Sequence, residues 1–260
     1  MTDDLSIQLR ERGIVLLRDV FRTDSLNRLK TAAERFFQAI GPERSLSEQY
    51  RYNRFSNSVL VTALMDFGCC SSEELWAPLS APGLWQLFTE VMGTAWSCNR
   101  EQSWVRKKLA PGRAAHSGYH LQGWHQDGAF MGADIRSLNV WLSLSHCGDD
   151  APGLDVVARR LDQIVPTGTD GAYMDWNVGP GMVERVAQGS VTRPIFEAGD
   201  ALIFDHMLLH RTAVDASMVR DRYAIESWFL APSTYASMMG IGGGVVSAGV
   251  TPRDQLPMLY

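Results

Sequence analysis

Helix-forming segments dominate the first third of the chain, and short strand-like runs occupy most of the rest. Apolar residues between 26 and 40 recur at the spacing of an amphipathic helix, and shorter helices are expected at Asp4–Arg12 and Leu84–Met92. Helices followed by many short strands are typical of an α+β chain built on a β-sandwich or barrel. This order of segments predicts a mainly β core with helices packed outside it.

The strand-like runs are bounded by turn residues such as Gly, Pro and Asp. The strongest run, Arg136–Ser145, is followed by a turn cluster at 148–153. The full set of expected strands is Ile14–Val20, Trp96–Leu109, Arg136–Ser145, Asp155–Ala158, Val191–Phe196, Ala201–Leu209 and Arg222–Leu230. Residues 43–80 are mixed and polar, and we expect them to form loops and short elements around an opening.

The sequence contains no internal repeat and no change of composition that would mark a linker. Its 260 residues fit one β-barrel or sandwich with helices, so a single domain over 1–260 is expected, with its core at about residues 8–230. The tail, residues 236–260, is rich in Gly and Met, and a flexible end is preferred there over a lid or an oligomer contact.

The charge balance disfavours a protein that mainly binds nucleic acid. The net charge at pH 7 is −5, whereas domains that hold phosphate backbones are usually strongly basic. No apolar run approaches the roughly 20 residues needed to span a bilayer. The 4 cysteines show no paired spacing and are expected to be reduced thiols. We therefore expect a cytoplasmic protein without a nucleic-acid or membrane partner; a homo-oligomer is left open.

The segment Trp124-His125-Gln126-Asp127-Gly128 offers two metal ligands. If it is extended, the side chains of His125 and Asp127 point to the same face, because side chains alternate along a strand. Such a pair supplies two of the three ligands of the facial triad of non-haem Fe(II) oxygenases. The pattern His-x-Asp is short and occurs by chance in many chains, so it requires a third ligand elsewhere.

A later segment provides that third ligand. Gly199-Asp200 makes a turn, the apolar run Ala201–Leu209 makes a strand, and His210 lies at its far end. His206 is the alternative, but a histidine inside an apolar run more often packs in the core or supports a ligand. His210 is therefore the preferred ligand.

An arginine begins the next expected strand. Arg222 precedes the mostly apolar run Tyr223–Leu230, and its planar guanidinium matches a carboxylate bidentately. A surface salt bridge is the simpler interpretation, and Arg220 is the alternative donor. Near a metal site, we expect Arg222 to bind a carboxylate partner.

Together these segments resemble the phytanoyl-CoA dioxygenase family. Residues 10–40, with a Gly-Ile-Val-Leu-Leu-Arg strand followed by a helix, resemble its N-terminal region. The Trp-His-Gln-Asp stretch at 124–127 looks like its first metal motif, Gly199 to His210 is similar to its second, and Arg222-Tyr-Ala-Ile is similar to its cosubstrate arginine. The resemblance extends from about residue 8 to 230.

The resemblance implies a double-stranded β-helix (jelly-roll, cupin-like) core with flanking helices. It implies Fe(II) bound by His125, Asp127 and His210, with Arg222 holding the far carboxylate of 2-oxoglutarate. Three protein ligands leave three coordination positions, two for 2-oxoglutarate and one for O2. The expected activity is oxidation of a small molecule, most simply hydroxylation, with succinate and CO2 as products. Related halogenases lack the carboxylate ligand, so Asp127 favours oxygen transfer.

Further contacts with the cosubstrate are implied on the strand before the metal motif. Trp104, Arg106 and Lys108 would share one face, and similar positions in the family face the cosubstrate, so Lys108 and Arg106 are expected to bind it or the substrate. A solvated edge is nearly as good an interpretation. The family's Pro-Gly-Ser-His turn is replaced here by residues starting at Ala158, so no particular substrate is transferred.

Two other functions share the same metal ligands. One is a non-haem iron oxygenase that does not use 2-oxoglutarate and has no need of Arg222; the other is a non-catalytic jelly roll that binds a metal or ligand. Aromatic residues outside the strands could line a substrate pocket, although packing is their commoner use. These are Trp76, Trp85, Tyr119, Tyr173 and Trp176. The sequence names neither the substrate nor the outcome, which could be hydroxylation, desaturation, cyclisation or epimerisation.

Overall fold

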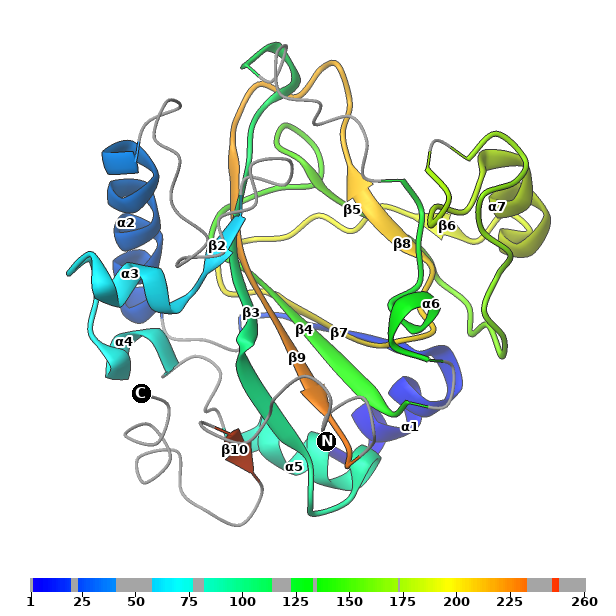
Figure 1. The fold of residues 1–260 in the computed structure, drawn as a ribbon, viewed down its shortest axis with the longest axis horizontal. Helices are drawn as coiled ribbons and strands as arrows, with labels where there is room; N and C mark the ends of the chain where they lie inside the picture. The colour runs from blue at the N-terminus through cyan, green and yellow to red at the C-terminus, as the bar shows by residue number, and fades with distance from the viewer. Residues whose placement is uncertain are drawn as a thin grey trace.

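Two antiparallel β-sheets face each other, and helices cover the outer face of the larger sheet (Figure 1). The computed structural model describes residues 2–19, 23–40, 58–76, 82–113, 123–132, 135–172, 174–232 and 245–247. The larger sheet has the order β1-β7-β4-β9-β3-β10 with β2 against β3, and the smaller has the order β6-β5-β8. This is the expected mainly β, jelly-roll architecture.

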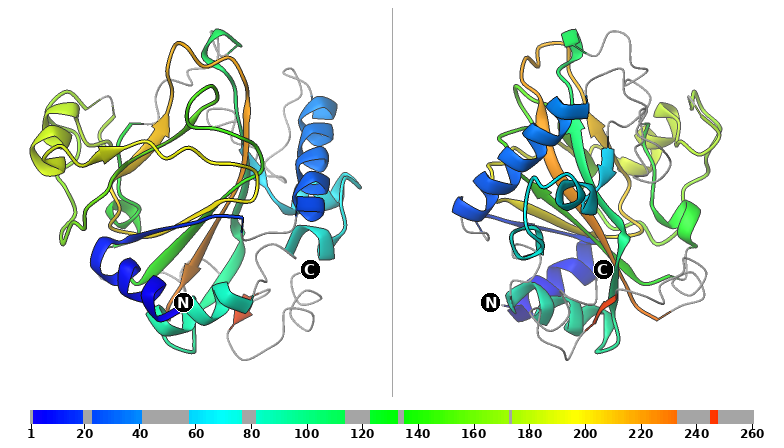
Figure 2. Two further views of the ribbon diagram at one scale, coloured as in Figure 1. Left: turned by 180° about the vertical axis from the view of Figure 1, so that it is seen from behind. Right: turned by 60° about the vertical axis from the view of Figure 1, so that its left-hand side comes forward.

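The strand bounds are β1 (Ile14–Leu17), β2 (Ser58–Leu60), β3 (Ser97–Lys108), β4 (Ser137–Ser143), β5 (Gly153–Val157), β6 (Val191–Thr192), β7 (Ala201–Asp205), β8 (His210–Ala213), β9 (Arg222–Leu230) and β10 (Val245–Ser247). The helices are α1 (Thr2–Arg12), α2 (Thr23–Ile40), α3 (Thr62–Asp66), α4 (Ser72–Trp76), α5 (Pro82–Met92), α6 (Gly128–Met131) and α7 (Pro180–Ala187), with a 3-10 turn at Pro111–Arg113. Figure 2 shows α2 and α7 on opposite sides of the two sheets.

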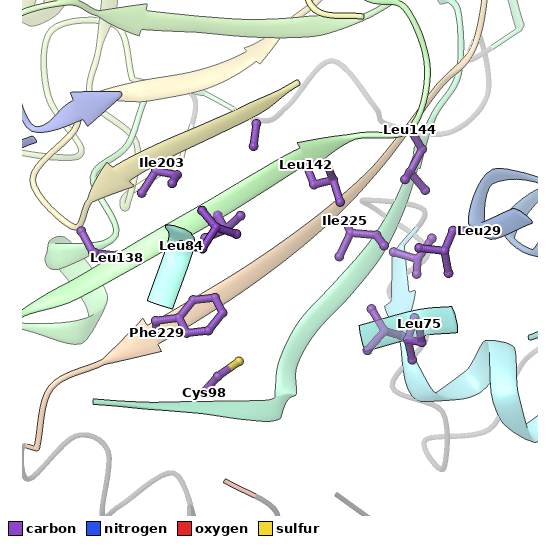
Figure 3. Packing of buried hydrophobic residues seen from close by; sticks show 14 of the residues in the cluster. Leu29, Leu75, Leu84, Cys98, Leu138, Leu142, Leu144, Ile203, Ile225 and Phe229 are labelled. Atoms are coloured by element: carbon purple, nitrogen blue, oxygen red, sulfur yellow. The ribbon is translucent and has the colours of Figure 1, made fainter. Parts of the chain in front are cut away.

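Alternation along the strands gives the larger sheet two chemically different faces. Its outer face carries residues such as Leu142, Ile203 and Ile225, which pack against helix residues including Leu29 and Leu84 (Figure 3). Fully burying a Leu or Ile side chain contributes roughly 1.5–3 kcal/mol. This outer core therefore contributes much of the stability of the larger sheet.

The inner face looks toward the smaller sheet. Trp141, Leu202 and Phe204 of the larger sheet pack against Leu154 and Val156 of β5. The same face also carries buried polar side chains on β4 and β9, among them an asparagine, an arginine and a glutamate. Polar groups are costly to bury unless they have partners, so this region is where a functional site is expected.

One expected strand is shorter than predicted and ends in a turn. The run Ala201–Leu209 was expected to form a single strand, but β7 ends at Asp205 and His210 begins β8. The Asp205 carboxylate accepts a hydrogen bond from the Met207 backbone N–H at 2.9 Å, and the backbone carbonyl of Asp205 accepts one from Leu208 at 3.2 Å. These bonds make a turn that carries the chain from the larger sheet to the smaller one.

Other boundaries differ more modestly. The expected strand Val191–Phe196 is formed only at Val191–Thr192, and Ile14–Val20 only to Leu17. The helix α7 was not expected, although a proline at its start is a helix-start signal. Of the tail, the described part is β10, which pairs with β3, so the expectation of a flexible end falls mostly outside the described residues.

Candidate metal centre

His125 and His210 lie directly opposite each other in an antiparallel bridge at the β8 edge of the smaller sheet. The backbone N–H of each donates to the carbonyl of the other, at 2.9 and 3.0 Å. Their rings consequently emerge side by side, with centroids 4.3 Å apart. The bridge joins the segment carrying the first motif to β8 and explains why two residues so distant in sequence meet.

Asp127 reaches the two imidazoles from a turn rather than from a strand. Its backbone is helical, with φ −60° and ψ −32°, and it immediately precedes α6. The condition that 125–127 is one extended segment is therefore not met at Asp127. The next residue, Gly128, donates its backbone N–H to the carbonyl of His206 at 2.8 Å, and a Cβ there would lie 3.1 Å from that carbonyl oxygen and 2.7 Å from the Ile164 side chain. Glycine thus permits the close approach that fixes this turn.

The turn brings three ligand atoms of the kinds that bind iron together. One atom from each of His125, Asp127 and His210 lies within 4.8 Å of the others, and His125 Nε2 is 3.9 Å from Asp127 Oδ1. The alternative ligand His206 lies in the turn after β7 and is not a member of this group. Two imidazoles and one carboxylate match the donor set of the facial triad.

Hydrogen bonds orient both imidazoles for metal binding. Nδ1 of His125 lies 3.0 Å from the Gly123 carbonyl, and Nδ1 of His210 lies 3.0 Å from the Leu208 carbonyl. A carbonyl only accepts, so each Nδ1 carries the proton and each Nε2 presents its lone pair. Burial, and next the proximity of His210, lower the pKa of His125 to about 4. At neutral pH this ring is uncharged, as a metal ligand must be.

The carboxylate of Asp127 has one satisfied oxygen and one open oxygen. Oδ2 accepts hydrogen bonds from the Trp228 indole N–H at 2.7 Å and from the Asn139 amide at 3.4 Å. Oδ1 is buried and has no hydrogen-bond partner among the described residues. Leaving a charged oxygen buried in this way is costly, and a cation beside the two Nε2 atoms would satisfy it. The residues present therefore fit a divalent metal ion.

A cavity extends from the metal ligands between the two sheets. It encloses about 400 Å³ of empty space, including its opening, and Arg222 is among its lining residues. Arg222 is buried, and its guanidinium carbon lies 5.1 Å from the centre of the Trp141 ring. Arg220, the alternative donor, lies at the surface and pairs with Asp150 at 2.6 Å. Of the two arginines, only Arg222 faces the space beside the ligands.

The two other expected cosubstrate contacts differ in position. Lys108 pairs with Arg222 in the β3–β9 register and is buried, so a solvated edge is wrong for this residue, but Lys108 does not line the cavity. Burial, and next the positive charges of Arg222 and Arg106, lower the pKa of Lys108 to about 7. Arg106 does line the cavity and forms an ion pair with Glu226.

The aromatic residues considered as pocket walls are separated by the fold. Trp176 packs edge-on against the His125 ring, with centroids 5.6 Å apart, and remains 44% exposed beside the metal ligands. Trp85 packs instead against Trp96 in the core beneath the helices. Tyr119, Tyr173 and the side chain of Trp76 lie outside the described residues.

Several polar residues of the site were not expected from the sequence. Thr212 lines the cavity and follows His210 by two residues; Glu226 and Trp228 continue the alternation that begins at Arg222. A period of two counted from the motif residues would have indicated all three. Asn139 has no such signal, because only the register of β4 against β9 places it beside Trp228.

A second group of possible ligands lies at the surface. It comprises His146, Asp149 and Asp150. Both ring nitrogens of His146 are already engaged, by Glu197 at 2.8 Å and by Asp149 at 2.7 Å. With Asp150 paired to an arginine, this group is a solvated ion cluster.

The two facing sheets and the His125, Asp127 and His210 group define a class, that of jelly-roll proteins with the ligand arrangement of a non-haem iron oxygenase. The sequence pattern of the phytanoyl-CoA dioxygenase (PhyH) family matches residues 9–218, and the chain belongs to this family. It is an iron- and 2-oxoglutarate-dependent oxygenase. No curated protein sequence matches the chain.

Solved structures share the fold at low sequence identity. EctD from S. alaskensis, solved with 2-oxoglutarate and 5-hydroxyectoine, has a TM-score of 0.62 at 15% identity, over 89% of this chain and 76% of that chain. The non-heme alpha ketoglutarate dependent epimerase SnoN from nogalamycin biosynthesis has 0.61 at 14%, over 96% and 94%. EvdO2 from Micromonospora carbonacea var. aurantiaca, complexed with 2-oxoglutarate, has 0.56 at 14%, over 97% and 95%.

Among the described helices, none is long and apolar enough to cross a membrane.

Proposed function

We propose that the chain hydroxylates a small molecule at an iron ion held by His125, Asp127 and His210, with Arg222 binding the far carboxylate of 2-oxoglutarate. The observation that carries this proposal is the buried Oδ1 of Asp127, which has no hydrogen-bond partner among the described residues. It lies close to the His125 and His210 side chains, beside a cavity lined by Arg222. When bound, iron supplies the oxidation of the substrate by O2, coupled to conversion of 2-oxoglutarate to succinate and CO2.

The protein's own residues prepare this reaction in four ways. The carbonyls of Gly123 and Leu208 hold the imidazoles in the tautomer that presents Nε2. The guanidinium of Arg222, packed on Trp141, offers a planar fork that matches a carboxylate. Leu154 and Phe204 contribute apolar side chains to the wall of the same cavity. Lys108 lies opposite Arg222 in the sheet and has a pKa lowered to about 7, so a dianionic cosubstrate bound nearby would favour its protonated form and gain further attraction.

We also propose that residues 1–260 form one oxygenase domain acting in the cytoplasm on a small molecule rather than on nucleic acid. The net charge of −5 disfavours nucleic acid as a substrate, and the small cavity favours a small molecule. EctD was solved with 5-hydroxyectoine and SnoN is described as an epimerase, so hydroxylation and epimerisation are both reasonable outcomes to test. Whether the chain forms a homo-oligomer is best measured directly in solution.

Binding of 2-oxoglutarate to the anaerobic Fe(II) protein tests this function. We expect a visible metal-to-ligand absorption band, and succinate on admission of O2, because 2-oxoglutarate would chelate the iron. Removing the metal with a chelator should abolish both signals, and adding Fe(II) back should restore them. Metal binding without the band or succinate would favour an oxygenase that does not use 2-oxoglutarate. Absence of any oxidation would favour a non-catalytic jelly roll.

Alanine substitution of the two candidate histidines should separate ligand from neighbour. His210→Ala removes an Nε2 donor and is expected to weaken Co(II) or Fe(II) binding by about 100-fold or more, above the 10- to 100-fold loss typical of residues that only support a ligand. His206→Ala deletes the same group four residues earlier and should leave metal affinity within about threefold. Isothermal titration under anaerobic conditions measures both. A reversed order would make His206 the ligand.

A further inference from the structure

Four side chains form a continuous polar chain from the cavity wall to the metal ligands. Arg106 on β3 pairs with one oxygen of Glu226 on β9, and the Asn139 amide on β4 donates to the other oxygen at 2.9 Å. The same amide nitrogen lies 3.4 Å from Oδ2 of Asp127. Glu226, Asn139 and Asp127 are all buried, so each polar atom in this chain depends on its neighbours.

The chemistry of these groups fixes which way the Asn139 amide points. A carboxylate only accepts hydrogen bonds, and both Glu226 and Asp127 present carboxylate oxygens to the same atom of Asn139. That atom must therefore be the nitrogen, whose two hydrogens serve the two carboxylates. If the amide were reversed, its oxygen would face two carboxylates and repel both.

Arg106 in turn limits how residue 226 can behave. A guanidinium only donates, so it requires an oxygen from residue 226. Glutamate meets both demands, with one oxygen for Arg106 and one for Asn139. A glutamine could meet only one of them with oxygen, because its other terminal atom is an N–H donor.

We propose that Glu226 is a positioning residue that sets the orientation of the Asn139 amide, so that Oδ2 of Asp127 receives a second hydrogen bond beside that of the Trp228 indole and Oδ1 stays directed at the metal. This inference rests on the metal site proposed above. Glu226 lines the cavity, but the role proposed for it acts through Asn139 and requires no contact with the substrate. It also places Arg106, a residue of the cavity wall, at the far end of the same chain.

A set of substitutions tests the proposal through metal affinity rather than turnover. Asn139→Ala removes a donor to Asp127 and should weaken Co(II) binding about 10- to 100-fold, the usual loss for a partner of a metal ligand. Glu226→Gln should weaken it by at least as much. Arg106 would donate to the side-chain oxygen of the glutamine, so the amide N–H of the glutamine would face Asn139. The Asn139 amide would then reverse to accept from this N–H, and its oxygen would also face Asp127. The double variant should be no worse than the poorer single variant, because the two residues act through one bond.

Rescue distinguishes a positioning role from a general loss of structure. Adding Arg106→Met to Glu226→Gln removes the guanidinium that donates to the glutamine oxygen. Residue 226 can then offer oxygen to Asn139 again, and metal affinity should recover to within about threefold of the wild-type value. The control is Ser227→Ala, which alters the adjacent buried residue on β9, on the opposite face of the strand. It should bind metal as the wild type does. Thermal unfolding of every variant monitors the fold.

The outcomes separate this inference from the proposed function. If Asp127→Ala abolishes metal binding while Asn139→Ala and Glu226→Gln bind like the wild type, the positioning role is wrong and the metal site stands. The role is also wrong if the Arg106→Met addition does not rescue. If Asp127→Ala itself binds metal like the wild type, the metal site is wrong and this inference is overturned with it.

Discussion

Replacing Asp127 with alanine is expected to abolish turnover and to weaken metal binding by about 100-fold or more, beyond the effect of losing a supporting residue. The side chain supplies the single negative charge of the three-ligand group, and its Oδ1 is buried without another partner in the described part of the chain. The variant should still fold, because the cost of leaving the Trp228 and Asn139 donors without an acceptor, about 1–3 kcal/mol each, is offset by removing a buried charge. Succinate formation and anaerobic metal titration measure the two effects.

The matched control is Asp149→Ala, which removes a carboxylate from the surface cluster around His146. This substitution also breaks a histidine–carboxylate contact, but it lies outside the cavity, so turnover and metal affinity should match the wild type. Normal turnover by Asp127→Ala would refute the assignment of the metal ligands. Loss of metal by Asp149→Ala alone would move the metal site to the surface.

The elements that the sequence predicts well are those with a strong local pattern. The strand Arg222–Leu230 was expected with the bounds that the structure has, and α5 begins two residues before the expected Leu84. The apolar run Ala201–Leu209 misleads because turn and strand there have the same apolar composition. The turn is made locally, by the Asp205 carboxylate accepting a hydrogen bond from the backbone N–H of residue 207, and the apolar residues on both sides obscure this turn signal in the sequence.

The candidate site shows the same division. His125, Asp127, His210 and Arg222 were expected from motif and resemblance, and the fold brings the first three together beside a cavity lined by the fourth. The reasoning that placed Asp127 on one strand face with His125 does not hold, because the position of Asp127 depends on a helical turn held by the His206 carbonyl. Among the supporting residues, the position of Asn139 depends on which strands are neighbours. That information lies in the register of the larger sheet and could not be read from a single sequence.

Arg222→Met should weaken 2-oxoglutarate binding while leaving metal affinity nearly unchanged. Truncating one partner of a buried, hydrogen-bonded charge pair costs about 2–5 kcal/mol, which corresponds to roughly 30- to 4,000-fold in the dissociation constant. Arg222 is buried against Trp141 in the cavity, so water does not readily replace its guanidinium. Methionine keeps much of the length and apolar contact of the side chain, and it removes a buried charge, so the fold should survive. Titrating 2-oxoglutarate into the anaerobic Fe(II) protein and following the absorption band gives the constant.

Arg220→Met is the control that decides between the two arginines. Its guanidinium is paired with Asp150 at the surface, where an ion pair contributes little and no cavity residue is affected. The dissociation constant for 2-oxoglutarate should therefore stay within about twofold of the wild-type value. A large loss with Arg220→Met and none with Arg222→Met would assign the cosubstrate to the surface arginine. If both variants bind 2-oxoglutarate as the wild type does, neither arginine holds the far carboxylate. The buried Lys108, opposite Arg222 in the sheet, would then be the next residue to replace.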